Sequence, residues 1–404
     1  MSDLLPIDEA LAVVAAQIVP LEVERARLEH AHGRFLAEDL TAELDLPPFP
    51  NSAMDGFAIR ARDTPGTLAV IGESAAGRPY AGARLAAGQA VGISTGAVLP
   101  DGADAVVPVE DVDGGDEEIT VGRAVLRGNH IREPGSDIVR GAPLMSAGTR
   151  IGPAQIGAAA AVGLRELPVR RLPRVAVLTT GTELRPLGAK LGPGEIYDSN
   201  GPMLATALRT AGGVAEPIGA AADTPEAHRE ALKRALEHDV VISSGGVSVG
   251  SHDLVREIGR ELGVRELFWR IALRPGKPLT FGVRDRTLVF GLPGNPVSTL
   301  VCFELFVRPA LLSLQGAPEF RPAFGAGVLG STVPRNPVRD DLIRVQVAWT
   351  SMPGKGRGNP VLLPLAEQQS HQIAVTAQAE GLARIPAGSG ELAAGSEVAY
   401  LPLS

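Results

Sequence analysis

Apolar and polar positions follow several different spacings along the chain, and each spacing predicts a different kind of element. Residues 6–18 repeat apolar side chains at helical spacing and end before Pro20, which predicts a helix. Residues 21–42 are also compatible with a helix. Small residues at 154–162 predict a further one. We therefore expect a helical N-terminal segment and a second helical stretch before residue 172.

Two other regions have the pattern of short strands separated by glycine and proline. The first extends from about residue 44 to 141 and predicts a small β domain, with apolar runs at 57–59, 90–94 and 105–109. The second begins at about residue 323 and predicts a closing β barrel or sandwich, with runs at 342–349, 361–363, 382–385 and 397–401.

Residues 173–322 alternate strands with helices. The runs expected to form strands are 174–178, 240–242, 266–273 and 287–290. Residues suited to begin a helix follow these runs: Ser199 or Asn200, Thr224 with Pro225, and Asn295 with Pro296. The alternation predicts a central three-layer α/β domain with a mostly parallel sheet, so the fold class is multidomain α/β plus β.

The stretch 239–253 joins a buried strand to a helix through a loop rich in glycine and serine. Such a loop leaves backbone N–H groups free to bind an anion, because glycine has no Cβ to block the approach. Asp253, at its end, could hold a cation beside that anion or simply cap the helix. Both interpretations fit the sequence, and the dinucleotide and P-loop fingerprints are missing from it.

Polar residues gather in the loops that follow the predicted strands. In a parallel sheet these loops meet outside one edge, so the fold itself would bring them together. Any one of the carboxylates alone is better explained as a cap or a solvated charge. Together with glycines and bases they fit a site for a phosphate and Mg²⁺. The residues are Thr182, Glu183, Asp223, Ser244, Gly245, Gly246, Ser248, Asp253, Arg274, Lys277 and Asn295.

Three features of this region have a plain structural alternative. Arg274 and Lys277 lie on a stiff turn with two prolines and could both be solvated. Arg270 alternates with buried neighbours and could pair with an acid. Cys302 lies in an apolar helical pattern and is expected to be a core thiol.

Composition narrows the possible functions. The net charge of −8 argues against general binding to nucleic acid or to an acidic membrane. A single cysteine excludes an internal disulfide, and no signal peptide or membrane-spanning run is apparent, so we expect a cytoplasmic protein. The seven histidines have no metal-ligand spacing. Neither a nucleophile elbow nor a cysteine-pair zinc motif is present, which weakens the hydrolase and structural-zinc hypotheses.

Asp55, Thr95 and Asp137 belong to a different part of the chain. They lie in rigid, proline- and glycine-rich loops of the first β region. Acids in such loops more often serve structure than chemistry. The residue pattern alone does not bring them to the α/β loops.

Six motifs, in this order, resemble the molybdopterin molybdenumtransferases, the family that includes the E domain of gephyrin. The resemblance covers nearly the whole chain. The α/β motifs alone would be shared with molybdopterin adenylyltransferases, and the first two motifs make the resemblance specific. The motifs are Pro-Phe-Pro-Asn-Ser-Ala-Met-Asp-Gly-Phe-Ala (48–58), Ser-Thr-Gly-Ala-Val-Leu-Pro-Asp-Gly-Ala-Asp-Ala-Val-Val (94–107), Thr-Gly-Thr-Glu-Leu (180–184), Ser-Ser-Gly-Gly-Val-Ser-Val-Gly-Ser-His-Asp (243–253), Arg-Pro-Gly-Lys-Pro (274–278) and Gly-Leu-Pro-Gly-Asn-Pro-Val-Ser (291–298).

The resemblance implies four domains and an elongated homodimer. The domains would be a discontinuous, mostly helical one (1–43 and 142–172), an inserted β domain (44–141), the α/β molybdopterin-binding domain (173–322) and a C-terminal β barrel (323–404). The active site would lie between the α/β domain of one chain and β domains of the other.

The implied reaction takes adenylylated molybdopterin and molybdate, with Mg²⁺, and yields molybdenum cofactor and AMP. The resemblance implies Glu183 and Asp253, with Asp223 nearby, as metal ligands, and adds Asp55, Thr95 and Asp137 to the catalytic set. It also implies substrate contacts from Arg270, Pro293, Ser298, Arg344 and Ser370. Relatives commonly have lysine at positions 270 and 274, and this chain has arginine at both.

Two other functions are compatible with the same fold. One is a molybdopterin adenylyltransferase, against which the extra β regions argue. The other is a non-catalytic molybdopterin-binding scaffold. Nothing in the chain has the pattern of a scaffold linker or a partner-binding tail, and the acidic residues of the site are present.

Overall fold

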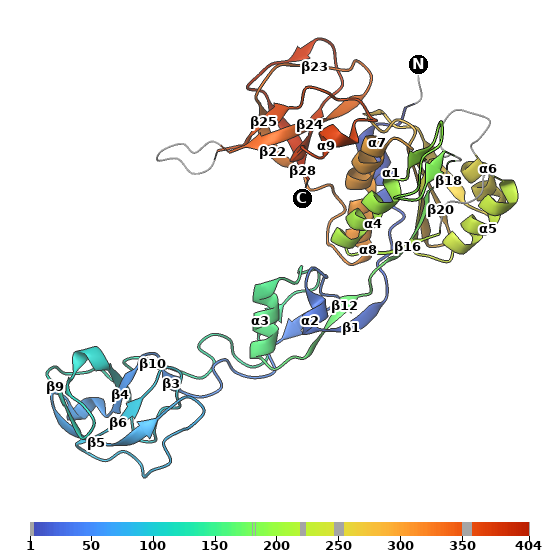
Figure 1. Ribbon diagram of the computed structural model, residues 1–404. Coiled ribbons are helices and arrows are strands. Elements are labelled where there is room, and N and C mark those ends of the chain that lie inside the picture. The colour runs from blue at the N-terminus through green and yellow to red at the C-terminus, as the bar shows by residue number, and fades with distance from the viewer. Residues whose placement is uncertain are drawn as a thin grey trace. The chain divides into compact units, whose positions relative to one another are not determined.

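A computed structural model describes residues 4–179, 181, 183–218, 224–245, 254–349 and 358–403 (Figure 1). The chain forms two compact units. One comprises Met1–Arg25, Gly33–Ala37 and Pro168–Ser404, and the other comprises Ala26–His32 and Glu38–Leu167. The predicted combination of an α/β domain with β domains is confirmed. The finer four-domain division stays a prediction.

The second unit contains a six-stranded β sheet in the order β7-β4-β6-β5-β9-β8. Its strands are β4 Gly56–Ile59, β5 Gly66–Ser74, β6 Gln89–Ile93, β7 Ala105–Pro108, β8 Asp113–Gly114 and β9 Glu118–Val121. Ile59, Leu68, Ile119 and Val121 are buried together against this sheet. The three strands predicted from the sequence are among the six, so the small β domain is confirmed.

The helix expected over residues 21–42 is wrong. This stretch contains strand β1 Val23–Arg27, one helical turn α2 Leu28–Ala31 and strand β2 Leu40–Thr41. Four of the five side chains in β1 are exposed. The strand therefore has no alternating apolar pattern by which the sequence could reveal it. The helices expected on either side are confirmed as α1 Ile7–Ala15 and α3 Pro153–Ala161.

The α/β part of the first unit has a six-stranded sheet in the order β16-β13-β17-β21-β20-β18. Strands β16, β13, β17 and β21 are parallel, and β20 is antiparallel to both β21 and β18, so β18 again runs with the first four. The strands are β13 Arg174–Thr179, β16 Val214–Pro217, β17 Val240–Ser244, β18 Arg265–Trp269, β20 Thr280–Arg284 and β21 Thr287–Leu292.

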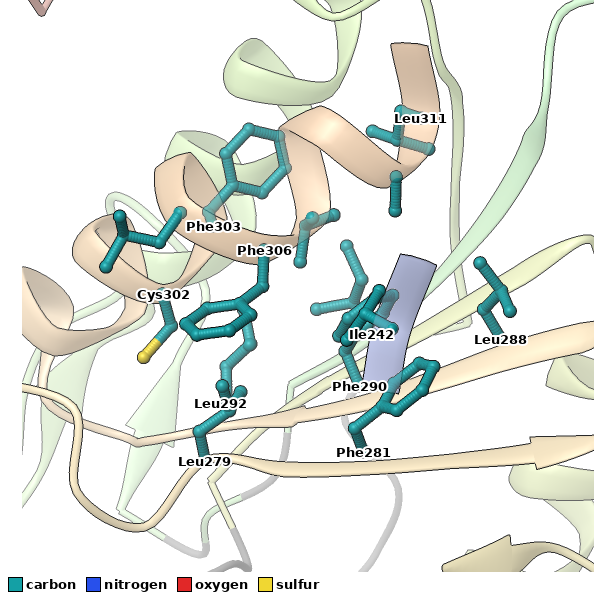
Figure 2. Packing of buried hydrophobic residues seen from close by; sticks show 14 of the residues in the cluster. Ile242, Leu279, Phe281, Leu288, Phe290, Leu292, Cys302, Phe303, Phe306 and Leu311 are labelled. Atoms are coloured by element: carbon teal, nitrogen blue, oxygen red, sulfur yellow. The ribbon is translucent and has the colours of Figure 1, made fainter. Parts of the chain in front are cut away.

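Helices cover both faces of this sheet (Figure 1). Alternate residues of β13 show the division, because Val175 and Val177 belong to one buried cluster while Ala176 and Leu178 belong to another. The larger cluster includes Phe281 and Phe290, whose rings are 4.8 Å apart (Figure 2). The helices are α4 Asn200–Thr210, α7 Pro296–Cys302 and α8 Arg308–Leu314 on the face of the larger cluster, and α5 Pro225–Ala235 and α6 Leu254–Glu261 on the other.

The strand expected over 266–273 is two strands. Arg270 separates β18 from β19 Leu273–Arg274 with a φ of +68°. This left-handed conformation turns the chain, and β19 then pairs with β24 of the C-terminal sheet. An apolar run cannot show that its two halves join different sheets.

The helical stretch Pro296–Leu314 is long and apolar enough to cross a membrane, but 78% of its most apolar window is buried in the unit. A π-helical segment, Phe303–Val307, joins its two α-helical halves. Cys302 is fully buried here, and burial raises the pKa of its thiol. The expectation of a core thiol is confirmed, and the stretch is the core helix of a folded unit.

The C-terminal region is a closed barrel of five strands in the order β24-β25-β22-β28-β26, with β26 pairing back to β24. The strands are β22 Gly325–Leu329, β24 Asp340–Ala348, β25 Val361–Pro364, β26 Gly381–Ile385 and β28 Glu397–Pro402. Val345, Leu362 and Ala383 are fully buried inside it. The barrel, rather than the sandwich, is therefore the correct alternative.

Asp239 stabilises the start of β17 and gives a pH-dependent prediction. Its carboxylate accepts hydrogen bonds from Arg171 at 2.6 and 2.7 Å and from the backbone N–H of Arg174 at 2.7 Å. Burial raises the pKa of Asp239, but these hydrogen bonds outweigh it and hold the pKa below its ordinary value of 3.8. A carboxylate with a lowered pKa stabilises the fold above its unfolded pKa, and this stabilisation is lost as the pH falls through the folded pKa.

Asp239→Asn is expected to lower the free energy of unfolding by about 1–3 kcal/mol at pH 7. The difference from the wild type should begin to shrink below about pH 4, where the carboxylate of the unfolded chain becomes protonated, and should be lost as the pH falls through the lower pKa of the folded protein. Urea unfolding at several pH values measures both effects. Glu237→Gln, an exposed neighbour, is the control. A difference that does not change with pH would contradict this explanation.

Candidate active site

The end of β17, at Ser244 and Gly245, lies against the residues that follow β21 at the carboxyl edge of the α/β sheet. The backbone N–H of Gly245 donates to the carbonyl of Leu292 at 3.4 Å. The side-chain amide of Asn200, at the start of α4, donates to Ser244 Oγ at 2.8 Å and to the carbonyl of Gly294 at 2.7 Å. One asparagine thus joins the two loops that the sequence predicts to face an anion.

Asn200 is a residue whose role the sequence did not reveal. Its side chain was expected to cap a helix at most, but Ser199 occupies the N-cap position and Asn200 is the first helical residue. Its Oδ1 is buried and has no hydrogen-bond partner within the described ranges. The sequence could not reveal these contacts, because asparagine is common at the start of helices regardless of what its side chain contacts.

Arg274 and Lys277 lie on a turn closed by backbone hydrogen bonds from Ile271 to Lys277 and from Arg270 to Leu279, both 3.0 Å. Arg274 forms an ion pair with Asp341, whose side chain is only 2% exposed. Burial raises the pKa of Asp341, against the attraction of Arg274. Lys277 is exposed and has no ion-pair partner in the described part of the chain. Of the two cations predicted here, Lys277 is therefore the one available to a ligand.

Asn295 connects the α/β sheet edge to the barrel within a single chain. Its side-chain amide donates to Ser370 Oγ at 2.9 Å, and the backbone N–H of Val297 donates to the carbonyl of Ser370 at 3.3 Å. Ser370 therefore contacts the α/β domain of its own chain, and its predicted substrate role stays a prediction. Pro293 and Ser298 are buried beside this contact, so their predicted substrate roles stay predictions.

Arg344 organises the barrel loop that carries Ser370. Its guanidinium is buried, and all five of its N–H groups have acceptors in residues 367–376. They donate to the carbonyls of Glu367, Gln369 and Gln372, to Thr376 Oγ1 and to Gln368 Oε1, over 2.8 to 3.3 Å. In the structure Arg344 holds this loop in place, and its predicted contact with substrate stays a prediction.

Glu183 is exposed just beyond the end of β13. It carries the predicted metal-binding carboxylate next to Gly181, where a Cβ would lie 2.6 Å from Glu183 Oε2. The carboxylate thus packs against the backbone of Gly181, which has no side chain. Carboxylate oxygens are the kind of ligand that Mg²⁺ prefers. Thr182, Asp223, Gly246, Ser248 and Asp253 lie outside the described residues. Within the described residues, no group of three acidic, histidine or cysteine side chains could by itself hold a metal.

A pocket of about 450 Å³ opens at Leu184, the residue after Glu183, between the end of β13 and the start of α4. Its lining is mostly apolar and includes Leu184, Pro186 and Pro202, with Thr179 and Asp198 as polar groups. A pocket of this size and character suits a flat ring system.

The second unit brings together two of its three predicted site residues. Asp55 Oδ1 accepts a hydrogen bond of 2.7 Å from the backbone N–H of Thr95, so the two loops predicted as separate turns form one structure. The loops are also joined by hydrogen bonds from Gly96 to the carbonyl of Ser52 and from Leu99 to that of Pro50. Asp137 lies in a loop bonded to Leu46 of the same incoming segment, and all three site residues are exposed.

Three family models match successive parts of this chain. The MoeA N-terminal region (domains I and II) matches residues 5–163, the probable molybdopterin binding domain matches 176–313, and the MoeA C-terminal region (domain IV) matches 326–403. A curated relative, molybdopterin molybdenumtransferase 2 of Mycobacterium tuberculosis, is 37% identical over 97% of this chain and 98% of its own length. The chain belongs to the molybdopterin molybdenumtransferase family. It is a transferase of molybdenum cofactor biosynthesis, as the sequence predicts.

Other members of the family agree over most of the chain. The molybdopterin molybdenumtransferase of Synechococcus elongatus is 38% identical over 76% of this chain and 78% of its own length. The solved structure of a molybdopterin biosynthesis MoeA protein from Pyrococcus horikosii has a TM-score of 0.81 and 34% identity, and covers 99% of both chains. The family's overall fold is thus shared.

Proposed function

We propose that the carboxyl edge of the α/β sheet is where this transferase inserts molybdate into adenylylated molybdopterin, releasing AMP and forming molybdenum cofactor. The observation that supports this most is the joining of loops at one edge. Asn200 connects Ser244 to Gly294, and Asn295 connects the same edge to Ser370. These hydrogen bonds hold side-chain amides and hydroxyls at that edge, and such groups can bind oxoanions.

Different parts of the site would bind different parts of the substrates. The loop at Ser244 and Gly245 and the ammonium of Lys277 would hold phosphate or molybdate oxygens. The pocket at Leu184 would take a ring system of the adenylylated pterin. Positioning and electrostatic stabilisation, not a covalent protein nucleophile, would account for most of the rate.

Glu183, with Asp253 and Asp223, would hold Mg²⁺. The ion, when bound, supplies Lewis-acid stabilisation to the departing AMP. The protein's part is to fix carboxylate oxygens beside the oxoanion site, and Glu183 has an exposed carboxylate at the required strand end.

Release of AMP tests this function. Purified protein is incubated with adenylylated molybdopterin and Mg²⁺, with and without molybdate. We expect AMP to appear only when molybdate and Mg²⁺ are both present. If the pterin binds but no AMP appears, the chain is a scaffold of the same fold. If it instead consumes ATP and adenylylates free molybdopterin, the adenylyltransferase alternative is correct.

We further propose that the working enzyme is a cytoplasmic homodimer whose site includes Asp55, Thr95 and Asp137 from the partner subunit's β domain. The observation behind this proposal is the hydrogen bond between Asp55 and Thr95. It fixes two exposed polar residues that are distant in sequence from Glu183.

Mixing two inactive variants tests the shared site. Asp55→Ala and Glu183→Ala proteins are each expected to be inactive, and hybrid dimers should recover activity because one of their two sites has both residues intact. Subunit exchange is verified by mass spectrometry of the mixture. Exchange without any recovery would mean that all site residues act within one chain.

A further inference from the structure

Trp269, the last residue of β18, is in contact with two guanidinium groups. The Cζ atom of Arg256 lies 4.1 Å and that of Arg270 3.7 Å from the centroid of its ring. Strand β18 runs in the direction of β13, β17 and β21, so Trp269 ends its strand at the same edge as the proposed site. Stacking of this kind restrains a planar guanidinium.

The two arginines have different surroundings. Arg256 is held by Glu266, donating from Nε at 2.8 Å and from a terminal nitrogen at 2.9 Å. Burial raises the pKa of Glu266, but Arg256 and Arg260 outweigh it and hold the pKa below its ordinary value. The charge of Arg256 is therefore balanced within the unit.

Arg270 has no acidic partner among the residues that the structure describes. Its backbone is fixed on both sides, since its N–H donates to Leu279 at 3.0 Å and its carbonyl accepts from Leu5 at 3.3 Å. Its guanidinium is half-buried, yet none of its five N–H groups has a hydrogen-bond acceptor in the ranges the structure describes. Half-buried guanidinium donors are normally bonded to a protein group, water or a ligand. The buried Nε1–H of Trp269 also has no acceptor there.

We propose that Trp269 is a positioning residue that holds the Arg270 guanidinium flat, so that its N–H edge binds an oxoanion of the substrates. This inference rests on the proposed function of the edge. A guanidinium stacked by its face keeps its edge free and can donate two parallel hydrogen bonds to two oxygens of one tetrahedral group. Molybdate and the substrate phosphates share that chemistry. An ammonium at the same position would be a point charge with no fixed orientation.

The chain's two tryptophans allow a direct test. Trp349 is 52% exposed and lies outside the proposed machinery, so Trp349→Phe leaves Trp269 as the only indole. Fluorescence of that variant is titrated with molybdate in one series and with AMP in another. We expect a saturable change in at least one series, and the series that responds identifies the oxoanion. Arg270→Lys in the same background should weaken the apparent affinity about tenfold or more.

Steady-state kinetics separate positioning from structure. Trp269→Leu removes the ring and should raise the KM for the responding substrate about tenfold with kcat nearly unchanged, while Trp269→Phe keeps a ring and should restore most of the loss. Circular dichroism verifies folding, and Arg270→Lys keeps the test valid if Trp269→Leu does not fold.

Failure of this inference can be told apart from failure of the proposed function. The positioning role alone would be overturned by three results together. The wild type would release AMP, the fluorescence of Trp269 would not respond to either ligand, and the KM would be unchanged in Trp269→Leu or Arg270→Lys. The opposite result is also possible. If the fluorescence of Trp269 responds saturably, Arg270→Lys weakens that response and the protein releases no AMP, oxoanion binding is supported and the transferase site is rejected.

Discussion

Arg344→Leu is expected to lower the free energy of unfolding by about 3–5 kcal/mol, one of the two largest effects predicted here. The arginine is 1% exposed, and its removal would delete all five hydrogen bonds that the guanidinium donates to residues 367–376. Burial also lowers the pKa of Arg344. Chemical unfolding measures the loss.

The same substitution should impair turnover, because the Arg344 contacts hold the loop whose Ser370 is bonded to Asn295. Arg344→Lys should lie between wild type and Arg344→Leu, since an ammonium offers three donors instead of five. Arg321→Leu is the matched control. Both side chains of the ion pair between Arg321 and Glu319 are exposed, so the pair should contribute less than about 1 kcal/mol to the free energy of unfolding. An Arg344→Leu protein as stable as that control would refute this role.

Glu183→Gln should lower AMP release by about 100-fold or more, because glutamine keeps nearly the same shape but removes the negative charge of the proposed metal ligand. Stability should change little because the side chain is exposed. The Mg²⁺ concentration for half-maximal activity should rise as well, and a titration of rate against Mg²⁺ shows both effects.

Glu226→Gln is the control for Glu183→Gln. It removes an exposed acid from the first turn of α5, which has no proposed part in the reaction. If both variants lose the same small amount of activity, general electrostatics and not metal binding would explain Glu183.

The sequence revealed several of the elements whose apolar pattern reflects burial, although the buried strand β20 was missed. Strands β13, β17 and β21 are almost entirely buried and were predicted within a few residues. Strand β16 was missed because it lies at a sheet edge with most of its side chains exposed. The break at Arg270 was missed because it depends on which sheet each half joins.

The site was predictable in its residue types but not in its contacts. Strand order brings the loops after β17 and β21 together, so Ser244, Gly245 and Asn295 could be grouped in advance. The bond between Asn200 and Gly294 joins residues 94 apart, and no local pattern encodes it. Likewise, the family pattern marks Arg344 as a site residue but cannot show that its donors are all used inside the barrel.

The most direct test of the central claim is a crystal structure of the protein with molybdate, AMP and Mg²⁺, with molybdenum located by anomalous scattering. We expect the molybdenum peak and the nucleotide phosphate at the carboxyl edge of the α/β sheet, within reach of Lys277, Gly245 and Glu183. Ordered molybdate and nucleotide bound anywhere else, with that edge empty, would contradict the account.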